Sequence, residues 1–289
     1  MNRIAWKCPV CGASLLPEYQ KKPYVMRCCA DHSFDIARQG YVNLLLAKKR
    51  SSASPGDSAE MVSARTAFLG GGYYRAFSDG VSAACLDLLG ENGLQRAVIA
   101  DAGCGEGYYT QNLCRYLGEH GIDAACVGFD LSKDAVTHAS SCAKRASMAD
   151  RLSYAVASIF ELPLADACCD GIINLFAPVA VKEFDRVLKK DGFLLCAVPG
   201  ERHLWGLKEA VYDTPYLNEV RRDVLDGFVL TEVRRIEDCV TICTQEHIRA
   251  LFSMTPYYWK TAKEDTEKLS RLQTLKTEIV FDLLLYRKR

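Results

Sequence analysis

The first residues of the chain that could do chemistry are a cluster of cysteines with a histidine. CPVCGASLLPEYQKKPYVMRCCADH, residues 8–32, holds four of the 14 cysteines and one of the five histidines. Cys8 and Cys11 form a CxxC pair, which presents two thiolates to one point, and a second pair from a facing turn completes the tetrahedron that zinc prefers. Cys28 and His32 have the better spacing for that second pair, with Cys29 held in reserve because adjacent cysteines rarely point at one ion. We therefore expect one structural zinc ion.

Other interpretations of these cysteines are weaker. A segment this short has too little apolar content to fold around buried thiols alone. A redox CxxC usually opens a helix after a strand, whereas Pro9 and Gly12 favour a knuckle turn. The start MNRIAWKCPVC has no apolar stretch of signal-peptide length, and no window approaches the roughly 18 apolar residues that span a bilayer. We expect a cytoplasmic protein without a membrane partner, whose cysteines stay reduced.

A second group of chemically informative residues is the glycine-rich stretch AVIADAGCGEGYYT, residues 97–110. A short buried-strand pattern precedes Gly103, Gly105 and Gly107, and a helix is expected to begin near residue 108. Glycines let the backbone and a ligand approach closely where side chains would collide. Asp101 and Glu106 flank this turn, so the predicted binding site carries acidic side chains.

Asp130 ends the next predicted strand, CVGFD, 23 residues after Gly107. An acidic side chain at that place in a βαβ unit can accept hydrogen bonds from both ribose hydroxyls of a nucleoside. NAD-type sites favour GxGxxG, with the pyrophosphate at the helix N-terminus. The acids beside this turn repel a pyrophosphate but suit a cationic, phosphate-free nucleoside. S-adenosylmethionine, with its sulfonium and ammonium groups, is such a ligand.

The elements that must position these residues alternate between strand and helix. Strands are expected at 98–100, 126–130, 152–158, 170–176 and 193–200, with a late antiparallel edge strand at 277–288, and helices at 59–69, 77–89, from about 108, and 181–192. This alternation predicts an α/β fold with a doubly wound, mostly parallel sheet. Ligands in such sheets lie outside the carboxyl ends of the strands, which adds Ser158 and residues 174–178 to the candidate site.

Composition divides the chain into three parts. We expect a zinc-binding domain at 1–45, a linker with a helical segment at 46–75 and the α/β domain at 76–289. Residues 1–50 carry nine Lys and Arg against three Asp and Glu, whereas the rest carries 27 against 33. A basic N-terminal part followed by an acidic remainder indicates contact with a polyanion, although an ordinary solvated surface explains the same counts.

In order along nearly the whole chain stand CPVC and CxxxH, HSFDIARQGYVNLL, PGDSAEM, DAGCGEGYYT, GFDLSKDAV, VPGERHL and MTPYYW. With these motifs the sequence resembles the bacterial 23S ribosomal RNA (guanine-N1)-methyltransferase family. The resemblance implies a Rossmann-like class I methyltransferase domain with a seven-stranded sheet, a small N-terminal zinc-binding domain, and methyl transfer from S-adenosylmethionine to N1 of a guanine in a 23S rRNA hairpin loop.

The resemblance also implies particular residues. The zinc ligands would be Cys8, Cys11, Cys28 and His32. Cofactor contacts would include Tyr74, Gly105, Glu106 and His203, beside Asp101, Gly103, Gly107 and Asp130 from the motifs above. Without the resemblance, a tyrosine after a glycine turn or a histidine after a strand is more often a packing or surface residue. The segment NLFAP, residues 174–178, offers no evident base, so no catalytic proton acceptor is assigned.

Some expectations concern RNA and remain open between alternatives. The arginine pairs at 221–222 and 234–235 could contact RNA or lie on solvated faces, and Tyr257, Tyr258 and Trp259 could stack a flipped base or pack in a core. A homodimer is compatible with this sequence and would offer a combined basic cleft. The competing functions are a methyltransferase of a small molecule or protein, and a non-catalytic zinc-dependent RNA-binding scaffold.

Overall fold

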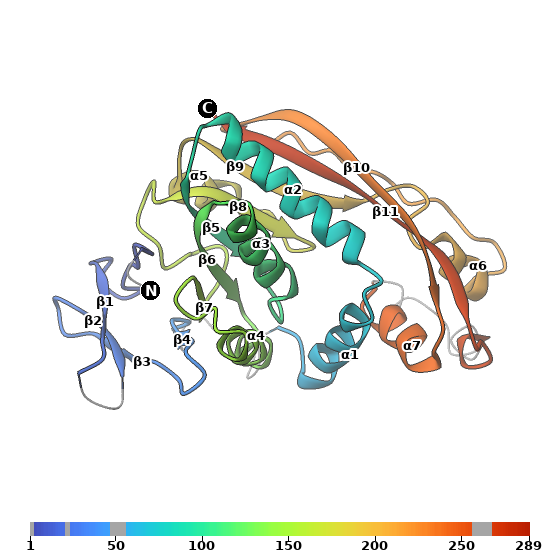
Figure 1. The fold of residues 1–289 in the computed structure, drawn as a ribbon, viewed down its shortest axis with the longest axis horizontal. Coiled ribbons are helices and arrows are strands. Elements are labelled where there is room, and N and C mark those ends of the chain that lie inside the picture. The colour runs from blue at the N-terminus through green and yellow to red at the C-terminus, as the bar shows by residue number, and fades with distance from the viewer. Residues whose placement is uncertain (1–2, 21–23, 47–55, 256–267) are drawn as a thin grey trace.

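The computed structural model describes residues 3–20, 24–46, 56–255 and 268–289, and it is built on one mixed sheet with a small hairpin module at its side (Figure 1). The large sheet has the strand order β10-β11-β9-β8-β5-β6-β7-β4. Its strands are β4 (Val42–Asn43), β5 (Arg96–Ala102), β6 (Asp123–Asp130), β7 (Leu152–Val156), β8 (Cys169–Leu175), β9 (Leu188–Pro199), β10 (Phe228–Ile242) and β11 (Leu275–Lys288). The neighbours from β9 to β4 pair in parallel, while β11 pairs antiparallel with both β9 and β10.

Six of these strands, β5 to β9 and β11, correspond to strands expected from the sequence. β10 brings the number to the seven that the resemblance implies, and β4 adds an eighth. β4 is only two residues long and comes from the N-terminal part of the chain, where Val42 lies opposite Ala155 of β7. The expected boundary after residue 45 therefore follows a strand that already belongs to the main sheet. The division into domains at 1–45, 46–75 and 76–289 stays a prediction.

Two expected elements are wrong in detail. The helix at 181–192 stops early: α5 is Val181–Val187, because Leu188 turns extended, is fully buried and pairs with Cys169 of β8. Pairing with the sheet outweighs the helix propensity of the LKKD stretch. The strand at 277–288 is not an edge strand, since β10 covers its outer side along 14 paired positions. Nine of the 15 β10 residues are exposed and six of those nine are polar or charged, so the sequence of β10 shows no buried-strand pattern.

Helices cover one face of the sheet. They are α1 (Ala59–Gly70), α2 (Arg75–Glu91), α3 (Tyr108–Glu119), α4 (Lys133–Arg145), α6 (Trp205–Val211) and α7 (Gln245–Ser253). Figure 1 shows α2 and α3 lying across the front of the strands. Alternate strand residues face this side, so that Ile99, Cys126 and Ile173 pack with Leu113 of α3 in one apolar cluster.

The N-terminal module covers part of the opposite face, where among the described helices only α5 contributes to the core. The module is a three-stranded antiparallel sheet of β1 (Leu15–Glu18), β2 (Val25–Cys28) and β3 (Ser33–Asp35). Its apolar residues share one cluster with the strand residues Val127 and Phe129 and with Phe184 of α5. Trp6 is 2% exposed and meets the Phe129 ring edge-on at 5.9 Å between centroids. The module is thus packed into the core of the larger domain.

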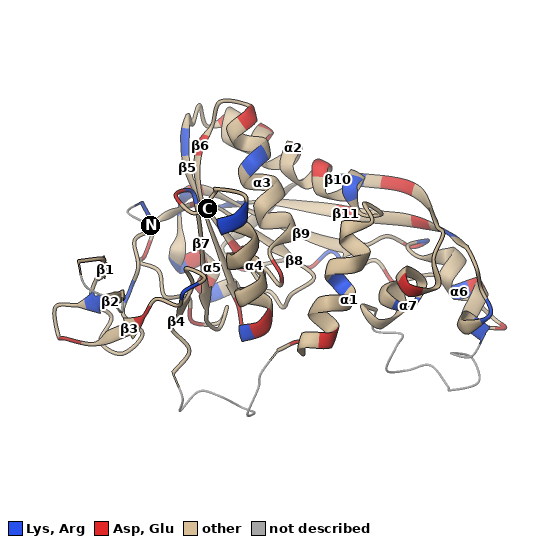
Figure 2. Cartoon of the chain, turned by 60° about the horizontal axis from the view of Figure 1, so that its bottom comes forward, with Lys and Arg blue, Asp and Glu red and all other residues tan. Residues whose placement is uncertain are grey.

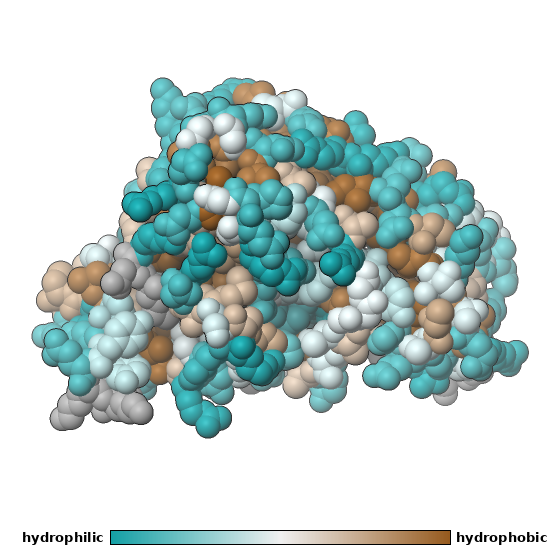
Figure 3. All heavy atoms as spheres, viewed as in Figure 1, coloured by the Kyte–Doolittle hydropathy of each residue, from teal (hydrophilic) through white to brown (hydrophobic). Residues whose placement is uncertain are grey.

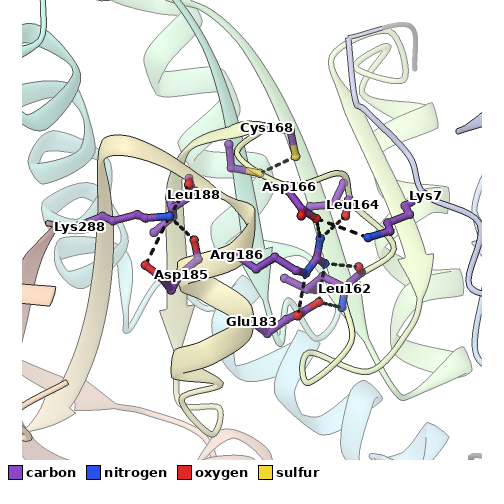
Figure 4. A network of polar contacts seen from close by, with 11 residues as sticks. Lys7, Leu162, Leu164, Asp166, Cys168, Glu183, Asp185, Arg186, Leu188 and Lys288 are labelled. Carbon is purple, nitrogen blue, oxygen red and sulfur yellow. Dashed lines mark hydrogen bonds and ion pairs between the residues drawn. The ribbon is translucent and has the colours of Figure 1, made fainter. Parts of the chain in front are cut away.

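Polar contacts fix this docking (Figure 4). The Lys7 amide donates to the Pro163 carbonyl at 2.9 Å, and the Ala165 amide donates to the Ala5 carbonyl at 2.8 Å. Arg186 of α5 braces the same loop by donating to the Leu164 carbonyl and to Asp166, at 2.8 and 2.6 Å. Figure 4 shows Lys7 reaching Asp166 from the other side, at 3.4 Å. In the face of the molecule shown in Figure 3, hydrophilic residues predominate and hydrophobic residues are visible in patches between them.

Candidate cofactor and zinc sites

The turns of the N-terminal module bring three cysteines and a histidine together. The ligand atoms of Cys8, Cys11, Cys28 and His32 all lie within 4.8 Å of one another. Cys11 Sγ is 3.7 Å from Cys28 Sγ, and His32 Nδ1 is 3.3 Å from Cys28 Sγ. Tetrahedral zinc with Zn–S bonds of about 2.3 Å separates its sulfur ligands by roughly 3.8 Å. The four side chains therefore fit one zinc ion, and Cys29, which is exposed, lies outside the group.

Local backbone geometry explains this convergence. The Gly12 amide donates to the Cys8 carbonyl at 2.8 Å, and Gly12 adopts a φ of +75°, which closes the first knuckle. In the second turn, burial acts to raise the pKa of Cys28, but hydrogen bonds from the Ala30 amide and the His32 ring outweigh it and lower that pKa to about 7. A thiol with this pKa is readily deprotonated, as a metal ligand must be.

The glycine-rich turn joins β5 to α3 as the sequence predicts. Gly103, Gly105 and Gly107 have φ of +90°, +54° and +82°, a region that other residues avoid. The space around them is also tight. A β-carbon at Gly103 would lie 2.5 Å from Ala177 Cβ, and one at Gly107 would lie 2.7 Å from Tyr154 Oη. These glycines let the turn lie directly against β8's continuation and against β7.

Two of the expected acids are held by hydrogen bonds around this turn. Asp130 accepts from the Gly105 amide at 3.0 Å and from the Ser132 amide at 2.8 Å, at the carboxyl end of β6. Asp101, at the end of β5, is 2% exposed and accepts from the Thr110 hydroxyl at 2.6 Å. Burial raises the pKa of Asp101 to about 7 and also raises that of Asp130. The site is thus short of positive charge.

Glu106 sharpens this imbalance. Its side chain is 5% exposed, and its Oε2 atom makes no hydrogen bond within the described structure. The nearest cation is Arg65 of α1, whose Nη1 lies 3.6 Å away, outside hydrogen-bonding distance. Burial raises the pKa of Glu106 despite that guanidinium. A buried carboxylate oxygen that makes no hydrogen bond, beside a glycine turn, fits a ligand that carries an ammonium group.

Arg65 was not expected from the sequence. It also forms an ion pair with Asp57, so that one guanidinium faces Asp57, Glu106 and the field of Asp130. The only sign of it in the sequence is a lone arginine in the helix that begins within PGDSAEM. The segment at 46–75, expected as a linker with a helical segment, contributes a charged side chain to the site from its helix α1.

Tyr74 and His203, two of the expected cofactor contacts, lie close to each other. Tyr74 Oη lies 3.5 Å from His203 Nε2, and His203 Nδ1 accepts the Val280 amide proton at 3.2 Å. Because Nδ1 is an acceptor, Nε2 carries the proton and donates toward Tyr74. Burial lowers the pKa of His203 to about 3, which keeps the ring neutral. The Phe281 ring packs against His203 at 4.1 Å between centroids.

Phe176 extends this aromatic group to the surface. It follows β8, adopts a φ of +63° and is 52% exposed. Its ring lies 5.0 Å from that of Phe281, 5.5 Å from that of Phe77 and 6.2 Å from that of Tyr109. The Asn174 amide shapes this loop by donating to the Ala102 and Pro178 carbonyls at 2.9 and 3.2 Å. An apolar platform therefore stands beside the acidic turn.

Other candidate residues lie in less informative places. Ser158 lies beyond β7 and hydrogen-bonds the Phe160 amide at 3.3 Å. Arg222 and Arg235 both pair with buried Asp282, at 3.1 and 2.7 Å, and Arg234 pairs with Asp87 at 2.8 Å, so these arginines have partners within the fold. The aromatic residues at 257–259 lie outside the described residues, and so do Lys48, Lys49 and Arg50, which belong to the basic first 50 residues.

Comparisons with known proteins bear on both sites. A family model described as "RlmA, N-terminal", a zinc ribbon, matches residues 6–53, and one described as "Methyltransferase domain" matches residues 100–196. A curated 23S rRNA (guanine(748)-N(1))-methyltransferase of Streptomyces fradiae is 34% identical over 206 residues, which cover 71% of this chain and 67% of that protein. The chain belongs to the 23S rRNA (guanine-N1)-methyltransferase family.

Further relatives agree with this assignment. YxjB of Bacillus subtilis strain 168, provisionally named a 23S rRNA (guanine-N1)-methyltransferase, is 29% identical over 97% of this chain and 96% of its own length. A protein of Micromonospora griseorubida with the same provisional name is 37% identical over 68% of this chain and 66% of its length. The resemblance drawn from the motifs is confirmed, and so are the expected fold class and the pairing of zinc with S-adenosylmethionine as cofactors.

Among solved structures, the YcgJ protein of Bacillus subtilis is 20% identical over 68% of this chain and 93% of its own, with a TM-score of 0.44. A geranyl diphosphate methyltransferase bound to sinefungin is 14% identical over 73% of this chain and 78% of its own, with a TM-score of 0.42.

Proposed function

We propose that this member of the guanine-N1 methyltransferase family transfers the methyl group of S-adenosylmethionine to N1 of a guanine in a hairpin loop of 23S ribosomal RNA. The observation that carries the proposal is that the zinc cluster and the glycine turn are joined through one hydrophobic core. A Cys3His cluster is packed through Trp6 onto the sheet that ends in an acid-lined glycine turn. A zinc-stapled module fixed beside a methyl-transfer site suits an enzyme that must position a large substrate.

The residues of the turn would hold the cofactor through its charges and hydroxyls. Asp130, oriented by two backbone amides, would accept hydrogen bonds from the ribose. Glu106 would pair with the ammonium through its free oxygen. Tyr74 and the neutral His203 would form an uncharged wall next to them. The cofactor itself supplies the activated methyl group, so the protein contributes binding, orientation and exclusion of water.

Guanine N1 carries a proton and faces its partner in a helix. The enzyme must therefore find the base in a loop or extrude it, and a group must accept the proton as the methyl arrives. His203 is a poor acceptor, because its Nδ1 already accepts the Val280 amide and its Nε2 donates toward Tyr74. Its lowered pKa, about 3, points the same way. His203 acts in this proposal as a positioning residue.

The zinc module would contact the RNA backbone. Figure 2 shows Lys and Arg interspersed with Asp and Glu along α1, α4 and β10 in the described part of the chain. Net charge is zero, so overall charge does not attract a polyanion. An RNA would therefore have to be attracted by a local group of basic residues. The first 50 residues hold the basic excess, and five of their nine cations lie outside the described residues. Binding to an rRNA fragment should weaken as salt rises if phosphate contacts contribute.

The proposal includes a cytoplasmic location and a homodimer as hypotheses. No helix among the described residues is long and apolar enough to cross a membrane. A homodimer would place two zinc modules on one RNA, and sedimentation of the purified protein tests for it.

Transfer of tritium from labelled S-adenosylmethionine tests the proposed function. The purified protein should label 23S rRNA that lacks this modification and should leave protein and metabolite fractions unlabelled. Label confined to a protein or small-molecule fraction would favour the competing enzyme functions. Calorimetric binding of S-adenosylmethionine tests the other competing function, because a non-catalytic RNA-binding scaffold with a vestigial site would not bind it.

A further inference from the structure

We propose that Arg65 binds the carboxylate of the methionyl group of S-adenosylmethionine. The guanidinium lies directly over the glycine turn, since a β-carbon at Gly105 would be 3.0 Å from Arg65 Nη1. The side chain is 23% exposed, so it is partly removed from water. It stands on α1, outside the sheet, and Asp130 is among the acids whose charge acts on it. The inference rests on the proposed use of S-adenosylmethionine and not on the RNA.

Arg65 faces two acidic side chains, and its contact with one of them is loose enough for a ligand to replace it. Its Nη2 faces Asp57, whereas its Nη1 approaches Glu106 only to 3.6 Å. The contact with Glu106 is an ion pair without a hydrogen bond. The Nη1 protons therefore do not bind Glu106 Oε2, and Oε2 accepts no hydrogen bond. A ligand with both an ammonium and a carboxylate satisfies both groups. Its ammonium would pair with Glu106, and its carboxylate would then accept from Arg65.

Asp57 keeps Arg65 in place for this role. The Asp57 carbonyl accepts the Ser132 hydroxyl proton at 2.7 Å, at the N-terminus of α4. Gly56 lies against the Ser132 backbone, with its would-be β-carbon 2.7 Å from the Ser132 nitrogen. The segment that carries Asp57 and leads into α1 is thus anchored beside Asp130, where the ribose would bind. Arg65 and the ribose-binding acid are held by one set of contacts.

Decarboxylated S-adenosylmethionine provides the test, because it lacks only the carboxylate. Calorimetric dissociation constants for this ligand and for S-adenosylmethionine are measured with the full-length protein and with Arg65→Gln. The wild type should prefer S-adenosylmethionine by about 10- to 150-fold, the range for a charge-assisted hydrogen bond. Arg65→Gln should lose that preference, with little change in affinity for the decarboxylated ligand. Arg96→Gln, at an exposed arginine at the amino end of β5, is the matched control and should retain the full preference.

Several results would overturn the inference. Equal wild-type affinities for the two ligands would do so, and so would an Arg65→Gln variant that loses affinity for both by the same factor, as a purely structural role requires. An Arg65→Lys variant that keeps part of the preference supports the charge. Wild-type protein that binds neither ligand would instead refute the use of S-adenosylmethionine, and the inference with it.

A second, independent observation concerns the RNA base. The geometry of Phe176 points to a stacking platform for the target guanine. A φ of +63° strains the backbone of a phenylalanine, and such strain is often found at functional sites. Half of the Phe176 side chain is exposed to solvent. The next residue, Ala177, lies against Gly103 of the cofactor turn. The ring therefore stands where a base must approach the methyl group, supported from behind by Phe77 and Phe281.

Rates of methyl transfer to 23S rRNA by a Phe176 series test this role, which rests on the proposed function. Phe176→Ala and Phe176→Leu should lower kcat/KM for RNA by about 5- to 150-fold, the range for base–aromatic stacking, while Phe176→Tyr should retain most of it. Calorimetric binding of S-adenosylmethionine should be unchanged in all three. Full rescue by leucine, which keeps the apolar packing without a π-face, would overturn the stacking role. An inactive wild type that binds the cofactor would refute the RNA function itself, and this role with it.

Discussion

Alanine at Gly107 tests whether the glycine turn is shaped by steric need. Gly107 caps α3 with a φ of +82°, and an added β-carbon would meet Tyr154 Oη at 2.7 Å, Ala139 Cβ at 2.8 Å and Gln111 Nε2 at 3.1 Å. Tyr154 and Ala139 are fully buried, so they have little room to move.

The expected loss of stability has two parts. Left-handed backbone costs a non-glycine residue about 1–2 kcal/mol, and overpacking a buried site costs about 1–3 kcal/mol more. The sum is about 2–5 kcal/mol, which for a chain of this size corresponds to a lowering of Tm by about 4–10 °C.

Gly105→Ala is the matched control, two residues away in the same turn. There the added carbon meets only the end of the flexible Arg65 side chain, at 3.0 Å. Only the backbone term applies, so that Tm should fall by about 2–4 °C. This variant should instead weaken S-adenosylmethionine binding, because its methyl group faces the space that the cofactor approaches.

Differential scanning calorimetry of zinc-loaded protein, with and without S-adenosylmethionine, measures both effects. Equal Tm values for Gly107→Ala and the wild type would refute the steric argument. Unchanged cofactor affinity in Gly105→Ala would refute the placement of the cofactor at this turn.

Three further predictions follow from the same structure. Cys11→Ser should lose zinc to a mild chelator, while Cys29→Ser keeps one zinc per chain by atomic absorption; equal retention would contradict the ligand set. Trp6→Ala should destabilise the protein by about 3–5 kcal/mol in urea titrations, because Trp6 is buried against Phe129; an unchanged midpoint would mean that the module is not part of the core. Asp101 has its pKa raised from 3.8 to about 7 by burial, so the folded state binds a proton more tightly than the unfolded state. Asp101 should therefore lower the unfolding free energy by up to about 4 kcal/mol as pH rises from about 4 to 7, and Asp101→Asn should show a correspondingly shallower slope; the same slope in both proteins would exclude Asp101 as a source of it.

The sequence predicts the elements whose pattern is local. The turn between β5 and α3 has a glycine signature, and α3 begins at Tyr108 as expected, because short-range backbone sterics decide both. The grouping of Cys8, Cys11, Cys28 and His32 follows from the spacing within two tight turns. Cys29, which the sequence left in reserve as a ligand, lies exposed outside the group.

Features that depend on distant pairing were missed. β10 carries exposed charges because it is a sheet edge, and only its pairing with β11 makes it a strand. Arg65 lies about 40 residues before the glycine-rich turn in the sequence. It reaches the turn only because α1 packs beside it, and no local sequence pattern indicates that packing. The packing of Trp6 into the far face of the sheet likewise joins residues more than 120 positions apart.

Mapping the methylated nucleotide tests the central claim most directly. An N1 methyl group blocks Watson–Crick pairing, so reverse transcriptase stops one nucleotide before it on the template. Primer extension on 23S rRNA from cells with and without this protein should give one stop, at a guanine in a hairpin loop, that depends on the protein and is restored by adding the purified protein with S-adenosylmethionine. Identical stop patterns in both RNAs, with no new stop after that addition, would contradict the account.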